Sequence, residues 1–279
     1  MSARLAFAVG QELPSAELTW FSPLRGLGFA ALELTLTPAT AWPSAEALAG
    51  CGVIAQGYTP GLTDGQGVAA AFNEVNPYLD ALRELGCQLL VVGEPTTRGR
   101  GQVAGRVHDT GARGLLEAEW RNLADALNEL GARCEERGYR LAFQPGAGTH
   151  VETATELKRL MNLTDPALVG LALDTGHWVV GGGHPREAIE TYRWRLNLVR
   201  LRDVSVEVLD TVVRHGLDWQ EAQRRRVFCR PGTGQAPLAD TLAALREIGY
   251  EGWLSLASDG LTGPEEAPEF CRQALAGLL

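Results

Sequence analysis

The sequence predicts an α/β fold, a (β/α)8 TIM barrel, in a single domain spanning residues 1–279. Short apolar runs alternate with longer amphipathic stretches along the whole chain, and eight such runs can be counted. No linker rich in proline or serine divides them. An open doubly wound sheet usually has fewer strands and a glycine-rich first turn. The first junction, Val9-Gly-Gln-Glu12, lacks that glycine pattern, which favours the closed barrel.

The expected strands are short runs of leucine and β-branched residues between polar or glycine-rich segments, a pattern typical of buried strands. In chain order they are Leu5–Val9, Ala31–Thr37, Val53–Tyr58, Gln88–Gly93, Arg140–Gln144, Val169–Asp174, Leu196–Arg202 and Trp253–Ser258. Helical patterns lie between them. The clearest spans residues 114–137, where apolar residues recur every three or four positions and charged residues occupy the opposite face.

Side chains alternate between the two faces of a strand, so every second residue shares the barrel interior. At the carboxyl ends of their strands, this alternation predicts one interior row that consists of Gln144, Asp174, Arg200 and Ala257. Glu33 and Glu94 end two further strands and add acceptors to the same rim. Because TIM barrels carry their active sites at this end of the strands, we expect the cleft here.

Composition excludes several classes of function. The net charge is −9 at neutral pH, so the surface repels a phosphate backbone and we expect no nucleic-acid partner. Five scattered cysteines without a Cys-x-x-Cys pair indicate reduced thiols in a cytoplasm. Leu5–Val9 is too short for a signal sequence and no uncharged run reaches membrane-spanning length, so we expect a cytoplasmic protein without membrane contact. Lys158, the only lysine, lies away from the strand ends, which argues against Schiff-base chemistry.

Three features have more than one interpretation. The loop 95–111 is rich in glycine and carries Arg98, Arg100 and Arg106. It is either a lid over an anionic or polyhydroxylated ligand, or a solvated or subunit-contact loop, and the second is favoured. The Gln-Arg-Arg-Arg run at 223–226 is interpreted as a solvated helix end. Large aromatic residues are usually core, but a sugar-stacking face is an alternative for Trp42, Trp178, Trp219 and Trp253.

Several short sequence motifs between residues 117 and 204 together carry a family resemblance. They are Glu117-Ala-Glu-Trp120, Gly146-Ala-Gly-Thr-His-Val-Glu-Thr153, Leu160-Met-Asn-Leu-Thr-Asp-Pro166, Leu173-Asp-Thr-Gly-His177, Gly182-Gly-His-Pro185 and Leu201-Arg-Asp-Val204. Weaker similarity continues through Gly249-Tyr-Glu-Gly-Trp253. On these motifs the last two thirds of the chain resembles the xylose-isomerase-like TIM barrel family of sugar phosphate isomerases and epimerases. Within it, the resemblance is greatest to the inosose dehydratases.

The resemblance implies a divalent cation, typically manganese, cobalt, magnesium or zinc, held by two glutamates, an aspartate and a histidine. Such an ion polarises a hydroxyketone and stabilises the enediolate formed by proton abstraction. In this chain Asp174 keeps the aspartate position and His177 a substrate contact, whereas the other ligand positions fall on Gln144, Arg200 and Ala257. Arginine cannot coordinate a cation, alanine has no donor atom, and glutamine offers only a weak neutral carbonyl. We therefore expect no tightly bound cofactor and at most a weakly bound divalent metal (Mn, Mg, Zn or Co).

Two classes of function remain open. The first is a sugar or polyol isomerase, epimerase or dehydratase acting on a small hydroxyketone, with Asp174, His177 and Arg200 as catalytic residues. Arg200 would replace the charge of the metal, pairing with Asp174 and presenting its guanidinium to an anionic oxygen. The second is a catalytically silent barrel in which that pair is structural and the site binds an anionic metabolite or a partner.

Further substrate contacts are expected from polar residues near the same rim. They are Glu33, Glu94, Gln144, His150, Arg202 and Arg230. Three arginines at the carboxyl-end rim, Arg200 among them, would favour an anionic ligand. The expected partner is thus a small polyhydroxylated or anionic metabolite, and a homodimer is left open.

Overall fold

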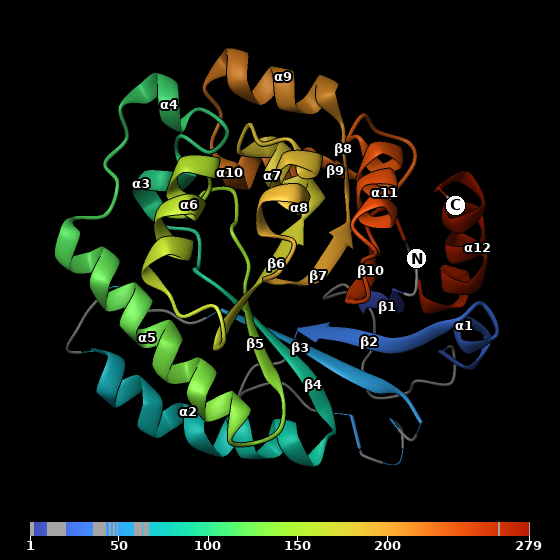
Figure 1. Cartoon of the computed structure of the whole chain (residues 1–279). Coiled ribbons are helices and arrows are strands. Elements are labelled where there is room, and N and C mark those ends of the chain that lie inside the picture. The colour runs from blue at the N-terminus through green and yellow to red at the C-terminus, as the bar shows by residue number, and fades with distance from the viewer. Residues whose placement is uncertain are drawn as a thin grey trace.

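The computed structural model describes residues 3–9, 21–35, 43–44, 46, 48, 50–58, 63, 67–261 and 263–278. Eight parallel strands close into a barrel in the order β1-β10-β7-β6-β5-β4-β3-β2 (Figure 1). They are β1 (Arg4–Val9), β2 (Phe29–Thr35), β3 (Gly52–Tyr58), β4 (Cys87–Gly93), β5 (Arg140–Phe143), β6 (Val169–Asp174), β7 (Leu196–Leu201) and β10 (Trp253–Ala257). The predicted TIM barrel is confirmed, strand by strand. The predicted strand residues 36–37, the first junction after Val9, and Trp42 lie outside the described residues.

Helices surround the barrel (Figure 1). They are α1 (Ser22–Gly26), α2 (Gly67–Glu84), α3 (Arg98–Gly101), α4 (Val107–Thr110), α5 (Glu117–Glu135), α6 (Ala154–Leu163), α7 (Thr175–Val180), α8 (Pro185–Tyr192), α9 (Val206–His215), α10 (Trp219–Arg224), α11 (Leu238–Glu247) and α12 (Ala267–Leu278), with a short 3-10 turn η2 (Pro264–Glu266) before the last. Helix α5 matches the helix expected over 114–137. None of the helices in the described part of the chain is long and apolar enough to cross a membrane.

The core has two layers, as the alternation along the strands predicts. Ala142, Ala172 and Leu198 belong to a small apolar cluster inside the barrel. The residues between them, such as Phe143 and Leu173, face outward and join the larger cluster between the strands and the helices. Burying one such leucine or phenylalanine contributes about 1.5–3 kcal/mol. The same alternation continues to the carboxyl end of each strand, where polar residues occupy the interior positions.

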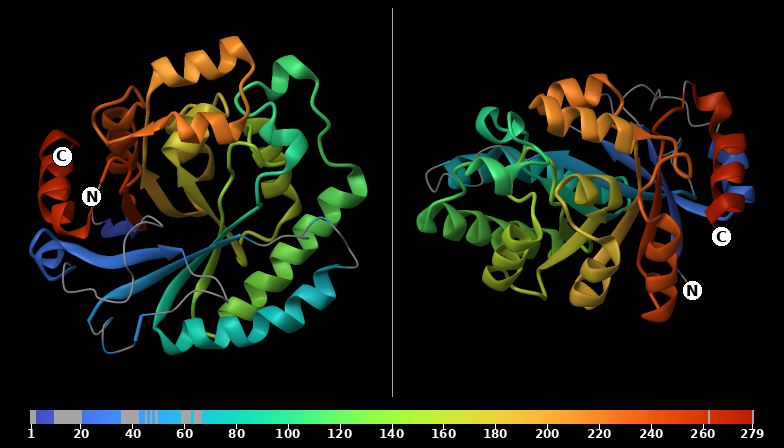
Figure 2. Two further views of the ribbon diagram at one scale, coloured as in Figure 1. Left: turned by 180° about the vertical axis from the view of Figure 1, so that it is seen from behind. Right: turned by 90° about the horizontal axis from the view of Figure 1, so that it is seen from above.

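One element was absent from the prediction. After β7 the chain forms a two-stranded antiparallel sheet, β8 (Asp203–Val204) with β9 (Phe228–Cys229). Helices α9 and α10 connect these two strands along the chain. The Asp203 carboxylate accepts hydrogen bonds from the N–H groups of Gly232 (2.9 Å) and Gly234 (2.8 Å), which holds the following turn. Figure 2 shows the segment between β8 and β9, which contains α9 and α10, at the same end of the molecule as α3 and α4. It forms one wall of the site.

Candidate functional site

A cleft of about 860 Å³ opens at the carboxyl ends of the barrel strands, where the sequence predicted it. The strand ends contribute its polar floor and one side, and β9 and α10 contribute the opposite wall. Its polar and aromatic lining includes Gln56, Glu94, Gln144, His177, Arg200, Arg202, Trp219, Arg226 and Phe228.

Arg200 extends from the end of β7 across the barrel mouth, and its side chain is only 1% exposed. A guanidinium has five N–H groups, and all five are engaged. Nε and Nη2 bind Glu33, Nη1 donates to Gln144 and to Asp174 (both 2.8 Å), and Nη2 donates to Gln56 (3.1 Å). Burial opposes the charge, but the carboxylates of Glu33 and Asp174 raise the pKa of Arg200 above its ordinary value. The predicted pairing with Asp174 is confirmed, but no N–H group is left for a substrate anion.

Asp174 ends β6 and caps helix α7. Its Oδ1 accepts the backbone N–H of His177 at 3.1 Å. Its Oδ2 accepts from Arg200 (2.8 Å) and from Arg202 (2.9 Å). Burial acts to raise the pKa of Asp174, but the charges of Arg202 and Arg200 outweigh burial and lower it below its usual range. Both oxygens of Asp174 are therefore engaged by donors of the protein, and the group stays ionised.

His177 lies in the first turn of α7 and lines the cleft. The backbone N–H of Ala147 donates to its Nδ1 at 3.0 Å, so the proton of the neutral ring sits on Nε2. The ring packs against Trp219 (centroids 5.6 Å apart) and Phe228 (4.8 Å). Burial lowers the pKa of His177 to about 4, although the charge of Asp174 acts in the opposite direction. His177 therefore offers a neutral N–H donor at pH 7.

Glu94 follows β4 directly, and it is 6% exposed. Its Oε1 lies 3.2 Å from Nδ1 of His150. Its Oε2 is buried and has no hydrogen-bond partner among the described residues. A buried carboxylate oxygen without a donor is costly unless a ligand supplies one. Glu94 thus provides an open acceptor in the cleft, whereas His150, an expected substrate contact, touches Glu94 but does not line the cleft.

Arg202 is the strand-end arginine that keeps donors available. Its Nε binds Asp259 and its Nη1 binds Asp174, both at 2.9 Å. Its guanidinium carbon lies 4.7 Å from the ring centroid of Phe228. Within the described part of the chain, its Nη2 has no hydrogen-bond partner. Arg202, rather than Arg200, is therefore placed to contact a substrate oxygen.

Of the other expected substrate contacts, only Gln144 lines the cleft. Glu33 is bonded to Arg200 and also accepts a hydrogen bond from the Ser255 hydroxyl at 2.6 Å. Arg230 is placed elsewhere: its guanidinium lies 4.7 Å from the ring of Phe270 and donates to Gln273 at 3.0 Å, both on α12. The structure does not bring Arg230 to the site, because the turn after β9 directs it toward this helix.

The arginine-rich loop 95–111 is bonded to the body of the protein. Arg100 is buried and pairs with Glu156 at 2.8 Å. The N–H of Gly105 donates to Glu152 at 2.7 Å, and Arg106 donates to the carbonyl of Leu217 at 3.3 Å. From this loop only residues 95 and 96 line the cleft. These contacts favour a structural role over that of a lid.

The positions that the family resemblance assigns to metal ligands do not fit a divalent cation. Both oxygens of Asp174 are engaged, Oε1 of Gln144 accepts from Arg200 and from Gln56 (3.4 Å), and Ala257 has no donor atom. In the described ranges, no group of three or more His, Cys, Asp or Glu side chains could hold a metal ion. The guanidinium of Arg200 at the centre of these positions also repels a cation.

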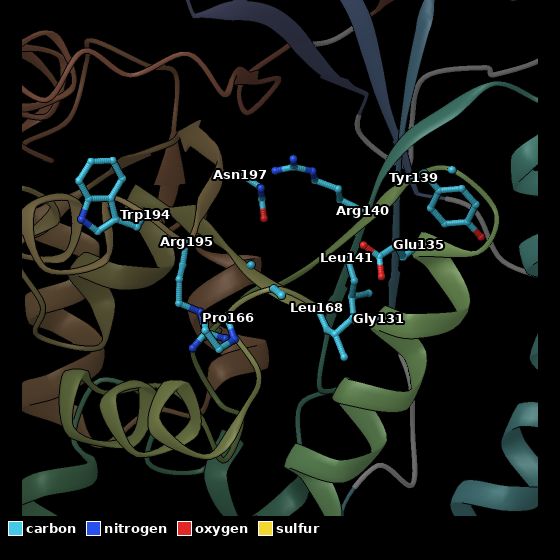
Figure 3. A pocket seen from close by; sticks show the side chains of 13 residues that line it. Gly131, Glu135, Tyr139, Arg140, Leu141, Pro166, Leu168, Trp194, Arg195 and Asn197 are labelled. Carbon is cyan, nitrogen blue, oxygen red and sulfur yellow. The ribbon is translucent and has the colours of Figure 1, made fainter.

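A second hollow, of about 450 Å³, lies at the amino-terminal ends of the strands (Figure 3). Arg195 donates there to the carbonyl of Val169 (3.0 Å) and to the hydroxyl of Thr164 (2.8 Å), so its guanidinium ties β6 to the end of α6. Trp194, at the edge of the hollow, is 85% exposed. This end of a TIM barrel usually serves stability, and the engaged arginine agrees with that role.

The fold and the cleft define an α/β barrel whose acid–base side chains lie at the carboxyl ends of its strands. The chain belongs to the xylose isomerase-like TIM barrel family, whose family model matches residues 26–274.

Two curated relatives are inosose dehydratases. The chain is 36% identical over 182 residues to that of Geobacillus kaustophilus (strain HTA426), covering 65% of this chain and 59% of the relative. It is 34% identical over 182 residues to that of Clostridium botulinum (strain Alaska E43 / Type E3), covering 65% of this chain and 61% of the relative. The chain therefore spans about three fifths of the length of these curated relatives.

Solved structures share the fold at low sequence identity. The IolI protein with a bound zinc atom has a TM-score of 0.72 at 17% identity, covering 99% of this chain and 97% of that one. The 3-keto-D-glucoside 4-epimerase of E. coli in its apo form has a TM-score of 0.69 at 18% identity, covering 99% of this chain and 98% of that one. Likeness at this level shows the barrel fold.

Several cleft residues were not expected from the sequence, among them Gln56, Phe228 and Arg226. Gln56 carried a signal: it is a polar residue two positions after Ile54, which faces the barrel interior, near the end of a predicted strand. Phe228 lies on the unpredicted strand β9, and Arg226 was assigned to a solvated helix end. Neither Phe228 nor Arg226 carried a local signal, because their positions depend on the tertiary packing of the segment that contains α9 and α10.

Proposed function

We propose that this protein is a sugar or polyol isomerase, epimerase or inosose-dehydratase-like enzyme that moves a proton on a small hydroxyketone without a divalent ion. The observation that carries the proposal is the open, buried Oε2 of Glu94 in the same cleft as the neutral His177. A carboxylate base with a neutral imidazole donor can transfer a proton next to a carbonyl group. The relationship to inosose dehydratases supports the choice of substrate class.

Each polar group has a role in this reaction. Glu94 Oε2 takes the proton from the carbon next to the carbonyl group, and the Nε2–H of His177 donates to the carbonyl oxygen. The free Nη2 of Arg202 stabilises the enediolate that forms. Glu94 then has two possible acceptors for the proton. Delivery to the former carbonyl carbon, while the remaining hydroxyl proton passes to the other enediolate oxygen, gives the isomer, and delivery to a departing hydroxyl, which leaves as water, gives the dehydrated product. The epimer forms when Glu94 loses its proton to solvent and a water molecule protonates the opposite face of the enediolate. Asp174 and Arg200 hold this arrangement in place.

The second candidate is the catalytically silent barrel. One observation favours it: the guanidinium of Arg200 is saturated by its neighbours, as expected for a purely structural ion network. Such a protein would bind an anionic metabolite in the cleft and leave it unchanged.

Solvent exchange separates the two functions. The protein, treated with a chelator, is incubated in D2O with scyllo-inosose or D-fructose, and deuterium on carbon is followed by NMR. The enzyme is expected to incorporate deuterium. Glu94→Gln should be slower by about 10²–10⁴-fold, the usual contribution of a general base. The matched control Glu129→Gln, on the exposed face of α5, should match the wild type.

Two results would contradict the proposal. Ligand binding without deuterium incorporation would favour the silent barrel. Exchange that appears only after a divalent metal is added would refute the metal-independent reaction.

A further inference from the structure

Helix α10 ends in a turn that normally requires glycine. The N–H of Val227 donates to the carbonyl of Ala222 (3.0 Å), and the N–H of Arg226 donates to the carbonyl of Gln223 (2.9 Å). These two bonds form a Schellman motif, in which the residue after the C-cap adopts the left-handed conformation. Arg226 occupies that position with φ +58°.

The chain itself shows what this position favours. Four further helices, α5, α7, α9 and α11, end in the same pair of hydrogen bonds. Each places glycine there: Gly138 (φ 84°), Gly182 (φ 79°), Gly216 (φ 62°) and Gly249 (φ 64°). In the described part of the chain, Arg226 is the only non-glycine residue with positive φ. A side chain destabilises this conformation relative to glycine, so arginine is retained here against its backbone preference. Such outliers are concentrated at functional sites.

Arg226 lines the same cleft as Arg202 and His177. Its two neighbours in the arginine run behave differently. Arg224 and Arg225 each pair with Glu221 at 2.7 Å, and neither lines the cleft. The whole run is exposed, as expected for a solvated helix end, but of these three arginines only Arg226 also lines the cleft.

The charges in the cleft single out the same residue. Arg200 is balanced by Glu33 and Asp174, and Arg202 by Asp174 and Asp259. For Arg226, the described residues provide no ion pair and no hydrogen bond to its side chain. It is thus a cleft-lining cation whose charge is left available in a protein of net charge −9.

We propose that Arg226 binds the anionic group, a carboxylate or a phosphate, of a polyhydroxylated ligand in this cleft. A guanidinium matches either group through paired N–H donors. The inference rests on the proposed function only for the identity of the cleft as the substrate site. It places the anion at the α10 wall and the rest of the ligand against Glu94, His177 and Arg202.

Calorimetric titration with D-glucuronate, D-glucose 6-phosphate and neutral D-glucose tests this inference and separates carboxylate from phosphate. The wild type should bind at least one anion more tightly than D-glucose. Arg226→Gly should lower the affinity for that anion by about tenfold or more, the usual effect of losing a charge-assisted contact. The affinity for D-glucose should not change. Its melting temperature should stay the same or rise, because glycine suits the turn.

Two further variants keep the test informative. Arg226→Asn tolerates the left-handed backbone and should weaken the anion equally, while the control Arg225→Ala should bind like the wild type. Equal anion binding by wild type and Arg226→Gly, or anions that bind no better than D-glucose, would overturn the inference. Deuterium exchange dependent on Glu94 is measured separately. If exchange is absent while anion binding still depends on Arg226, only the proposed function fails.

Discussion

Replacing Arg200 by methionine tests the ion network at the barrel mouth. The substitution keeps much of the side-chain volume and removes all five N–H groups. Asp174 retains its bond from Arg202 at 2.9 Å, but Glu33 retains only the Ser255 hydroxyl at 2.6 Å. The variant therefore leaves the carboxylate of Glu33, which is 1% exposed, without a counter-charge.

The size of the effect follows from this burial. Removing one partner of a buried ion pair usually costs about 3–5 kcal/mol, because the other charge stays behind without solvent. We expect the free energy of unfolding of Arg200→Met to fall by about that amount at pH 7. The loss should come from the uncompensated charge of Glu33, so a neutral side chain at that position should relieve it. The double variant Arg200→Met/Glu33→Gln should recover part of the loss for the same reason.

Urea unfolding followed by circular dichroism measures these differences. Arg186→Met is the matched control, because Arg186 also contacts three carboxylates, those of Asp240, Glu190 and Glu247, but at the protein surface. Solvent screens surface pairs, so its loss should be much smaller. The reasoning is refuted if Arg200→Met costs no more than Arg186→Met, or if Glu33→Gln recovers nothing.

Three other predictions concern the cleft. With a folded pKa of about 4 against an ordinary 6.5, His177 stays neutral in the folded state while the unfolded chain takes up a proton, so stability falls as the pH drops from 6.5 to 4. His177→Asn should remove about 2–3 kcal/mol of this pH dependence in urea titrations at several pH values, and an unchanged slope would contradict it. Arg202→Met should lower kcat by about 10²–10³-fold with little change in KM; a loss confined to KM would deny it a role in the transition state. Gln144→Glu/Arg200→His/Ala257→Glu should gain manganese binding by calorimetry, and failure to bind would show that the family's ligand positions are misassigned.

The barrel could be predicted from the sequence because its signals are local. Runs such as Val169–Asp174 identify buried strands from neighbouring residues alone, and alternation within each run assigns the interior face. The same reasoning placed Gln144 and Arg200 at the cleft. It failed for Arg230, whose direction depends on a turn after an unpredicted strand.

The sequence by itself thus determined the fold, the end of the barrel that carries the cleft, and several of the side chains that meet there. Only the tertiary structure decided which of them remain available. The partners that saturate Arg200 come from β2, β3, β6 and the residue that follows β5, up to 167 positions away in the chain. No local pattern could therefore show that its donors are used. The tertiary structure also directed Arg226 into the cleft, because the backbone of one left-handed turn sets the direction of its side chain.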